Sequence, residues 1–348
     1  MAYVMRGNAT DEQGATSPIG TLLLVALALV AAAGVGLFVL DLSAGQGAPT
    51  AEAAFEYTET PAGLEMTAVG IGEDVVVELN GQSVASFDSD EAGKTVLLPT
   101  APDDRITVVS RDGDQTVLVN RQVDSREDVG DLISYYTFDQ GTGSTVVDRS
   151  GNGNDGEAFE GWSRVSDDTG TALDFDGTSG THVDIGDLSV DGPASVDELT
   201  IAIHYRKDGG ANSIQNLIEH QEGGFAWYME TDGNHVDPHR MRYTIGYNNP
   251  PSGTLYTGDI DEGEPQVLIG TFDGDQMVLY RNGQRVGSVA LDRDVALGDV
   301  ILGADSDPSG VGQNIDGRIY EMRLYYTSFS DDEVDVLTRA VQSNSTAT

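Results

Sequence analysis

The apolar run from Ile19 to Leu40 constrains this chain more than any other feature of its sequence. It carries no charged residue, and at about 1.5 Å per residue such a helix crosses the roughly 30 Å hydrocarbon core of a bilayer. A cleaved secretion signal has a shorter apolar core behind a basic segment, whereas this leader sets Arg6 against Asp11 and Glu12. We therefore predict one membrane-spanning helix over residues 15–42, with the C-terminal remainder displayed outside the cell membrane.

A short motif, Gly14-Ala15-Thr16-Ser17-Pro18-Ile19-Gly20, opens the apolar run. It resembles the N-terminus of archaeal type IV pilins, especially those of halophilic archaea. The resemblance implies that residues 1–14 are a leader cut off after Gly14, that Ala15 becomes the mature N-terminus, and that the helix packs against other pilin subunits in a pilus. Pro18 suits the first turn of a helix, but Gln13 stands where these signals usually carry a charged residue. The alternative is a plain anchor that contacts only membrane lipid.

The chain is strongly acidic, with a formal net charge of −40. The acidic residues are spread along its length, and the basic residues are arginines except for Lys94 and Lys207. Such a surface repels itself in dilute buffer and is screened in concentrated salt, which agrees with the halophile resemblance. Nucleic acid is excluded as a partner because phosphate binding needs a basic patch. Cysteine is absent, which excludes disulfides and thiol chemistry.

A small β-domain is predicted directly after the membrane helix. Residues 43–53 are small and Gly-rich, which is typical of a linker. Short alternating segments follow over residues 54–125, and one of them, Val75–Leu79, runs into the hairpin signal Asn80-Gly81. We predict a compact antiparallel sandwich. It is similar to the small β-domain of archaeal pilins, and we interpret it as a spacer without a ligand.

A second, larger set of strand signals fills residues 131–341. Its markers, in chain order, are Tyr136-Thr137-Phe138-Asp139, the loop Asp148–Gly156, Phe175-Asp176-Gly177, the hairpin Leu279–Gly287 and the closing strand Ile315–Tyr325. As a series these motifs resemble the laminin G-like, concanavalin A-type jelly-roll family. The resemblance implies two antiparallel sheets packed face to face. The predicted fold class is thus an all-β ectodomain, a small sandwich plus a larger jelly roll, on one N-terminal transmembrane helix.

The end of the chain is predicted to form a short helix and a tail. Ser330 and Glu333 have the spacing of a capping box, which indicates a helix start. A polar tail follows over residues 342–348, and Asn344-Ser345-Thr346 is a glycosylation sequon outside the membrane.

Two loops have the residue types and spacing of calcium ligands. Oxygen-bearing side chains at alternate positions, followed by a glycine, imitate part of an EF-hand loop, although no pair of flanking helices is predicted. The resemblance to laminin G-like domains also implies a structural calcium ion near such loops. The alternative interpretation is an ordinary turn, which favours the same residues. The candidate ligands are Asp148, Ser150 and Asn152 in the first loop and Asp305, Asp307 and Asp316 in the second.

Aromatic side chains are the candidates for ligand contact, because rings stack on the apolar faces of sugars. Strand alternation sends Trp227 and Tyr228 to opposite faces, so one of the two belongs in the core. The candidates are Trp162, Trp227, Tyr228, Tyr243 and Tyr247, with Tyr256 as a further ring.

The sequence predicts a non-catalytic protein. We find no nucleophile-elbow motif and no strand with carboxylates spaced along one face for glycoside hydrolysis. The predicted function is a surface-displayed, pilin-like membrane protein whose distal domain binds glycan or protein, in adhesion or as a minor pilus subunit. Two alternatives stay open: a structural cell-surface module without a ligand, and a cell-surface glycoside hydrolase.

Overall fold

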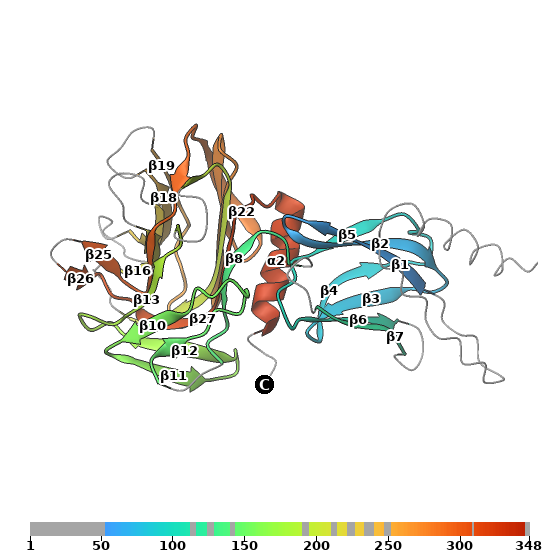
Figure 1. Cartoon of the computed structure of the whole chain (residues 1–348), viewed down its shortest axis with the longest axis horizontal. Coiled ribbons are helices and arrows are strands. Elements are labelled where there is room, and N and C mark those ends of the chain that lie inside the picture. Colours follow the sequence, from blue (N-terminus) through green and yellow to red (C-terminus); the bar gives the residue numbers. More distant parts are fainter. Residues whose placement is uncertain are drawn as a thin grey trace, which may run out of the picture.

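In the computed structural model of the protein, two all-β units lie on either side of the helix α2 (Asp331–Asn344) (Figure 1). The structure describes residues 53–111, 116–123, 129–139, 143–189, 195–209, 214–220, 227–232, 240–246, 252–307 and 310–344. The predicted leader, membrane-spanning helix and most of the linker lie outside these residues. Within the described ranges, no helix has the length and apolar character needed to cross a membrane.

The proximal unit is a sandwich of two antiparallel sheets, in strand orders β1-β2-β5 and β4-β3-β6-β7. Its strands are β1 (Ala53–Thr60), β2 (Gly63–Ile71), β3 (Val75–Leu79), β4 (Gln82–Phe87), β5 (Thr95–Leu98), β6 (Arg105–Ser110) and β7 (Val117–Gln122). The hairpin predicted at Asn80-Gly81 joins β3 to β4, and both residues have positive φ, 53° and 85°. This is the backbone of a type I′ turn, which asparagine and glycine adopt most readily.

The distal unit contains two eight-stranded antiparallel sheets. We call the sheet beside α2 the inner sheet and the other the outer sheet. The inner sheet has the order β11-β12-β27-β15-β20-β21-β22, with β8 also paired to β27; the outer sheet has the order β19-β18-β17-β16-β24-β13-β10-β9.

The strands of the inner sheet are β8 (Leu132–Tyr136), β11 (Trp162–Ser166), β12 (Thr171–Asp176), β15 (Leu199–Lys207), β20 (Gln266–Phe272), β21 (Gln276–Arg281), β22 (Gln284–Ala290) and β27 (Asp316–Tyr325). Those of the outer sheet are β9 (Thr145–Val146), β10 (Gly156–Phe159), β13 (His182–Asp187), β16 (Asn216–His220), β17 (Trp227–Thr231), β18 (Met241–Ile245), β19 (Gly253–Tyr256) and β24 (Asp299–Leu302). Two short pairs complete the unit: β14 (Ser195–Val196) with β23 (Val295–Ala296), and β25 (Asp305–Asp307) with β26 (Gly310–Gly312).

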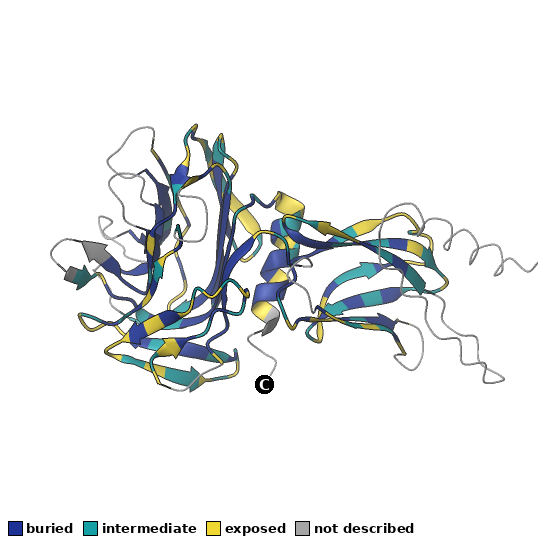
Figure 2. Cartoon of the chain, viewed as in Figure 1, coloured by how far each residue is buried: buried dark blue, intermediate teal, exposed yellow. Residues whose placement is uncertain are grey.

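The central strands of the inner sheet are buried on both faces, and alternation divides their side chains between two cores. On β15, Ile201 and Ile203 point into the core between the two sheets, while Ala202 points the other way. Ala202 belongs to a second hydrophobic core, the shared core, that also contains proximal residues such as Leu79 and Val108. Strands buried on both faces read as nearly continuous apolar runs, as β15 and β20 do. The dark strands beside α2 in Figure 2 are this doubly covered sheet.

Helix α2 lies at the centre of the shared core. Its start is the predicted capping box: the Ser330 backbone N–H donates to Glu333 at 2.7 Å, and the Glu333 N–H points back to the Ser330 hydroxyl at 3.5 Å. Its fully buried side chains include Val334 and Leu337. The helix contacts β15, β20 and β27 of the distal unit as well as β4 and β5 of the proximal unit. The last helix of the chain therefore completes the core of the first domain.

A buried charge network crosses the joint beside this helix. Arg323 on β27 is fully buried and donates to the backbone carbonyl of Pro99 in the proximal unit at 2.7 Å and to Glu321 at 2.6 Å. Its guanidinium also lies 4.5 Å from the centre of the Tyr135 ring. A buried charge is tolerated only when it is paired and hydrogen-bonded. Arg323 therefore ties the two units together at a defined position.

Candidate functional site

The outward face of the outer sheet presents a continuous row of side chains across seven strands. The strand registers place these residues directly beside one another, from β10 to β19. Their neighbours along each strand, among them Trp227, Met229 and Tyr243, point inward to the core. The row consists of Glu157, Asp184, Ile301, Glu219, Tyr228, Thr244 and Thr254.

A second row on the same face brings a carboxylate, a guanidinium and an aromatic ring together. Glu230 on β17 is in register with Arg242 on β18, which is in register with Tyr256 on β19. The Arg242 Nε donates to Glu230 at 2.6 Å, and its guanidinium lies 5.4 Å from the centre of the Tyr228 ring. The same side chain thus makes an ion pair and a cation–π contact.

A second arginine, at the edge of this face, makes the same combination of an ion pair and a cation–π contact closer to solvent. Arg240 pairs with Asp232 through its Nε at 2.9 Å and lies 4.2 Å from the centre of the Tyr256 ring. Tyr256 is 39% exposed, one of the most exposed large hydrophobic side chains in the described part of the chain. The two arginines therefore hold two tyrosine rings in place, one beneath the surface and one at it.

Burial changes the acid–base behaviour of the second row. Glu230 is only 4% exposed, and this desolvation raises its pKa to about 7, although the neighbouring Arg242 acts to lower it. Glu219 is also buried, lies on the neighbouring strand and points to the same face. The face thus contains two buried carboxylates, one of which titrates near neutral pH.

At the opposite end of the same face, two rings lie parallel on β10 and β13. Phe159 and His182 are in register, with ring centres 4.8 Å apart and an interplanar angle of 8°. Phe159 is 37% exposed. An exposed aromatic side chain therefore lies near each end of the face, Tyr256 on the edge strand β19 and Phe159 on β10, next to the edge strand β9.

The structure separates the predicted aromatic candidates. Trp227 and Tyr243 are fully buried between the sheets, so we correct their assignment: they are core residues, not residues of a binding surface. Tyr228 lies on the outward face, as the alternation allowed, and is only 7% exposed there. Trp162 is half-buried on β11 of the inner sheet, with the Arg164 guanidinium 5.2 Å from its ring centre. Tyr247 lies outside the described residues.

The first predicted calcium loop is held by its own hydrogen bonds. The buried Asp148 carboxylate accepts from the backbone N–H groups of Tyr135, Ser150 and Asn154 and from the Ser150 hydroxyl. The Asn152 side-chain amide donates to two carbonyls of β8, at 2.7 and 2.8 Å. These donors engage both oxygens of the Asp148 carboxylate. The loop is joined to β8 by these hydrogen bonds. Calcium binding here stays a prediction.

The second predicted calcium loop is spread over two strands, β25 and β27. Asp305 and Asp307 belong to β25, and Asp305 accepts from the Gln313 amide at 2.6 Å. Asp316 begins β27, where burial and the nearby Asp208 raise its pKa. Within the described ranges, no three histidine, aspartate or glutamate side chains converge to hold a metal ion.

The remaining predicted sites lie at the ends of the chain. Gly14 and Ala15, the predicted processing site, are outside the described residues. Asn344, the predicted glycosylation site, is the last residue of α2.

Several residues of the outer face could not be selected from the sequence. Tyr228 and Glu230 alternate within one strand and Arg242 and Thr244 within another. That period-two pattern shows which side chains share one side of each strand. It does not show that the two strands are neighbours or that these side chains lie on the same side of the sheet. The pairing register between strands brings these residues side by side, although their segments are distant in the sequence.

Comparisons with known proteins bear on the distal unit. Residues 175–335 match the family model of the concanavalin A-like lectin/glucanases superfamily. A search of curated proteins finds no match. The family match and the two packed sheets support a laminin G-like, concanavalin A-like jelly-roll fold for the distal unit.

Solved structures share this fold at low identity. The HCR/D-Sa-GBL1/C protein is 11% identical with a TM-score of 0.50, over 61% of this chain and 52% of that one. The binding domain of Paraclostridial mosquitocidal protein 1 is 13% identical with a TM-score of 0.48, over 60% and 52%. Domain 4 of AbnA, an extracellular arabinanase from Geobacillus stearothermophilus solved with arabinotriose, is 18% identical with a TM-score of 0.45, over 60% and 98%. The chain spans about half the length of the first two.

Proposed function

We propose that the distal domain binds glycan chains on the outward face of its outer sheet. The observation that carries the proposal is the pair of tyrosines held by arginines, Tyr228 under Arg242 and Tyr256 under Arg240, within rows of hydroxyl and carboxylate side chains. A sugar presents apolar C–H faces and a ring of hydroxyls, so it needs both kinds of group. The match to a superfamily named for lectins and glucanases supports the same proposal.

The charge of the molecule favours neutral glycans. The two arginines that the structure describes on this face are paired with carboxylates, Arg242 with Glu230 and Arg240 with Asp232. The whole chain carries a net charge of −40. An anionic polymer would therefore meet long-range repulsion, and neither of these two arginines is unpaired to offset it. We propose neutral oligosaccharides as the ligand class.

Display on a membrane completes the proposal. The apolar run Ile19–Leu40 supports a single-span anchor, and the motif around Gly14 supports a pilin-like protein in adhesion or in a pilus. N-terminal sequencing of protein from the native membrane tests this part. A mature start at Ala15 would support the pilin assignment, and an intact leader would contradict it.

The binding test uses the full chain in detergent and a panel of neutral and acidic oligosaccharides, with affinity measured by calorimetry. Tyr256→Ala should weaken the best neutral ligand about tenfold, the factor that corresponds to a loss of about 1.4 kcal/mol. Val286→Ala is the matched control, because Val286 is similarly exposed but lies on β22 of the inner sheet. Equal effects of the two substitutions, or binding of no oligosaccharide, would contradict the proposal.

A glycoside hydrolase is the second candidate function, and one observation favours it. Glu219 and Glu230 are buried on neighbouring strands of the same face, and the pKa of Glu230 is raised to about 7. A carboxyl group with such a pKa is protonated in part at neutral pH and can serve as a general acid. Release of reducing ends from a bound oligosaccharide, lost in Glu230→Gln, would establish this function. Binding without any release would leave the binding function alone.

A further inference from the structure

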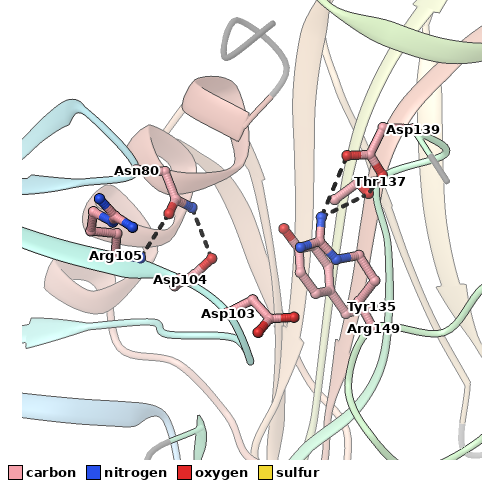
Figure 3. Close-up of a pocket in the computed structure, with 8 residues that line it drawn as sticks. All are labelled: Asn80, Asp103, Asp104, Arg105, Tyr135, Thr137, Asp139 and Arg149. Carbon is pink, nitrogen blue, oxygen red and sulfur yellow. Dashed lines mark hydrogen bonds and ion pairs between the residues drawn. The ribbon is translucent and has the colours of Figure 1, made fainter. Parts of the chain in front are cut away.

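A pocket of about 340 Å³ lies between the two units, on the side of the distal domain opposite the outer sheet. Each unit supplies one wall (Figure 3). The proximal wall consists of Asn80, Asp103, Asp104 and Arg105, and the distal wall of Tyr135, Thr137, Asp139 and Arg149. A volume of this size is at the small end of ligand pockets, which suits a single sugar ring or a small polyol.

The proximal wall is held in place by hydrogen bonds inside its own unit. The Asn80 amide donates to Asp104 at 2.8 Å and accepts from the Arg105 backbone N–H at 2.8 Å. The second oxygen of Asp104 accepts from the Ala101 N–H at 2.8 Å. Asp103 directly precedes Asp104 and has a positive φ of 70°. Its carboxylate points toward the opposite wall (Figure 3). Within the described residues, the Asp103 side chain has no hydrogen-bond or ionic partner.

The distal wall presents donors that are also pre-positioned. The Arg149 guanidinium is 3.3 Å from the Thr137 hydroxyl and 3.5 Å from Asp139, and it lies 5.7 Å from the centre of the Tyr135 ring. The Arg149 backbone N–H donates to the Tyr135 carbonyl at 2.7 Å, which fixes the start of this side chain. Arg149 thus keeps part of its five-donor fork directed into the pocket (Figure 3).

The two walls differ in what they offer a ligand. Asp103 can only accept hydrogen bonds, whereas Arg149 can only donate them. An anion would satisfy the guanidinium but meet three aspartates, and a cation would satisfy the aspartates but meet two arginines. A hydroxyl group donates to one wall and accepts from the other. The lining residues carry one net negative charge, so a neutral ligand avoids the cost of an unpaired charge in the pocket.

We propose that the pocket between the units is a binding site for a small neutral polyhydroxylated ligand, a polyol or a single sugar residue. The ligand bridges Asp103 of the proximal unit and Arg149 of the distal unit. It therefore binds only when the two units are in their described arrangement, and its binding stabilises that arrangement. This site is separate from the glycan-binding face and does not depend on it.

The test is a titration of the full chain in detergent, followed by saturation-transfer NMR with myo-inositol and methyl glucoside as neutral probes. Sulfate and methylammonium, at matched ionic strength, serve as the anionic and cationic probes. Asp103→Ala should weaken the better neutral probe about tenfold. Asp90→Ala, an exposed aspartate of the same unit outside the pocket, should leave the affinity unchanged, as should Tyr256→Ala on the outer sheet.

Two results would overturn the proposal: no neutral probe binds, or Asp103→Ala and Asp90→Ala weaken binding equally. Displacement of the neutral probe by sulfate or methylammonium at lower concentration would also overturn it, because the pocket would then be an ion site. If oligosaccharides bind with dependence on Tyr256 but the small probes do not depend on Asp103, the outer-face function stands and the pocket proposal fails.

Discussion

The two sheets of the distal domain have the same number of strands and share one core, but their outward faces differ completely. The inner sheet turns Ala202, Val267, Ile269 and Val278 outward, and α2 and the proximal unit cover them. The outer sheet turns carboxylates, hydroxyls, arginines and tyrosines outward instead. The difference teaches that the two sheets use their outward faces differently: the inner sheet attaches the domain to the rest of the chain, whereas the outer sheet presents the polar and aromatic rows on which the proposed function rests.

The largest effect on stability is expected from a charge placed in the shared core that covers the inner sheet. Leu337 on α2 is fully buried in the shared core. Leu337→Asp should lower the free energy of unfolding by about 5 kcal/mol or more, because it places an unpaired carboxylate in an apolar site. Since the core is shared, amide hydrogen exchange in β3 and β6 should accelerate together with exchange in β15 and β20. Asp332→Ala, on the exposed side of the same helix, is the control.

An effect on the distal unit alone would contradict the shared core. The proximal sandwich would then be an independent domain, with α2 resting on it without contributing to its stability.

The next effect tests the buried charge at the joint. Arg323→Met removes the partner of Glu321 and the donor to the Pro99 carbonyl. Leaving a buried charge uncompensated destabilises by about 3 to 5 kcal/mol. The double substitution Arg323→Met with Glu321→Gln should recover part of this loss, because no unpaired charge is left. Chemical denaturation of the three variants measures both quantities, and no recovery in the double variant would show that Arg323 acts mainly through packing against Tyr135.

The third prediction concerns pH and belongs to the outer face. Burial raises the pKa of Glu230 in the folded protein from 4.5 to about 7, so the folded state holds this proton more tightly than the unfolded state. The resulting stability is complete below about pH 4.5 and is lost as pH rises through about 7, a change of about 3 kcal/mol. Glu230→Gln should remove this component, so the difference in unfolding free energy between variant and parent should shift in favour of the variant between pH 4.5 and 7.

Glu59→Gln is the matched control for that pH profile, because Glu59 is exposed on β1. A pH-independent difference between Glu230→Gln and the parent would mean that Arg242 keeps Glu230 ionised throughout.

The comparison of the two faces also separates what the sequence predicts from what it cannot. The turns at Asn80-Gly81 and Asn282-Gly283 and the capping box at Ser330 follow from local chemistry, and the structure confirms them. Alternation correctly sent Trp227 and Tyr228 to opposite faces. These features depend on residues close in the sequence, whose backbone preferences act whatever the rest of the chain does.

The functional parts depend on contacts between distant segments. The pairing of Glu230 with Arg242 needs the register of β17 and β18, and the role of α2 needs a partner surface more than 200 residues away, between Gln82 and Leu98. An amphipathic helix at the end of a sequence does not reveal that it completes the first domain. In the loop at Asp148, the residues with ligand-like spacing make hydrogen bonds within the loop, and calcium binding there stays a prediction. Residue types alone do not distinguish a cation loop from a well-bonded turn.

The smallest effect on stability is expected near the β10 end of the outer sheet's outward face. Phe159 and His182 stack in parallel at the surface, and Phe159→Ser should leave stability within about 0.5 kcal/mol of the parent, since surface substitutions rarely do more. If long oligosaccharides extend across the whole face from Tyr256 to Phe159, the substitution should weaken them about threefold while short ones keep their affinity. Calorimetry with a series of increasing chain length measures this. Equal loss for short and long chains would place the binding site at the Phe159 end, and no loss at any length would confine it to the tyrosines held by Arg240 and Arg242.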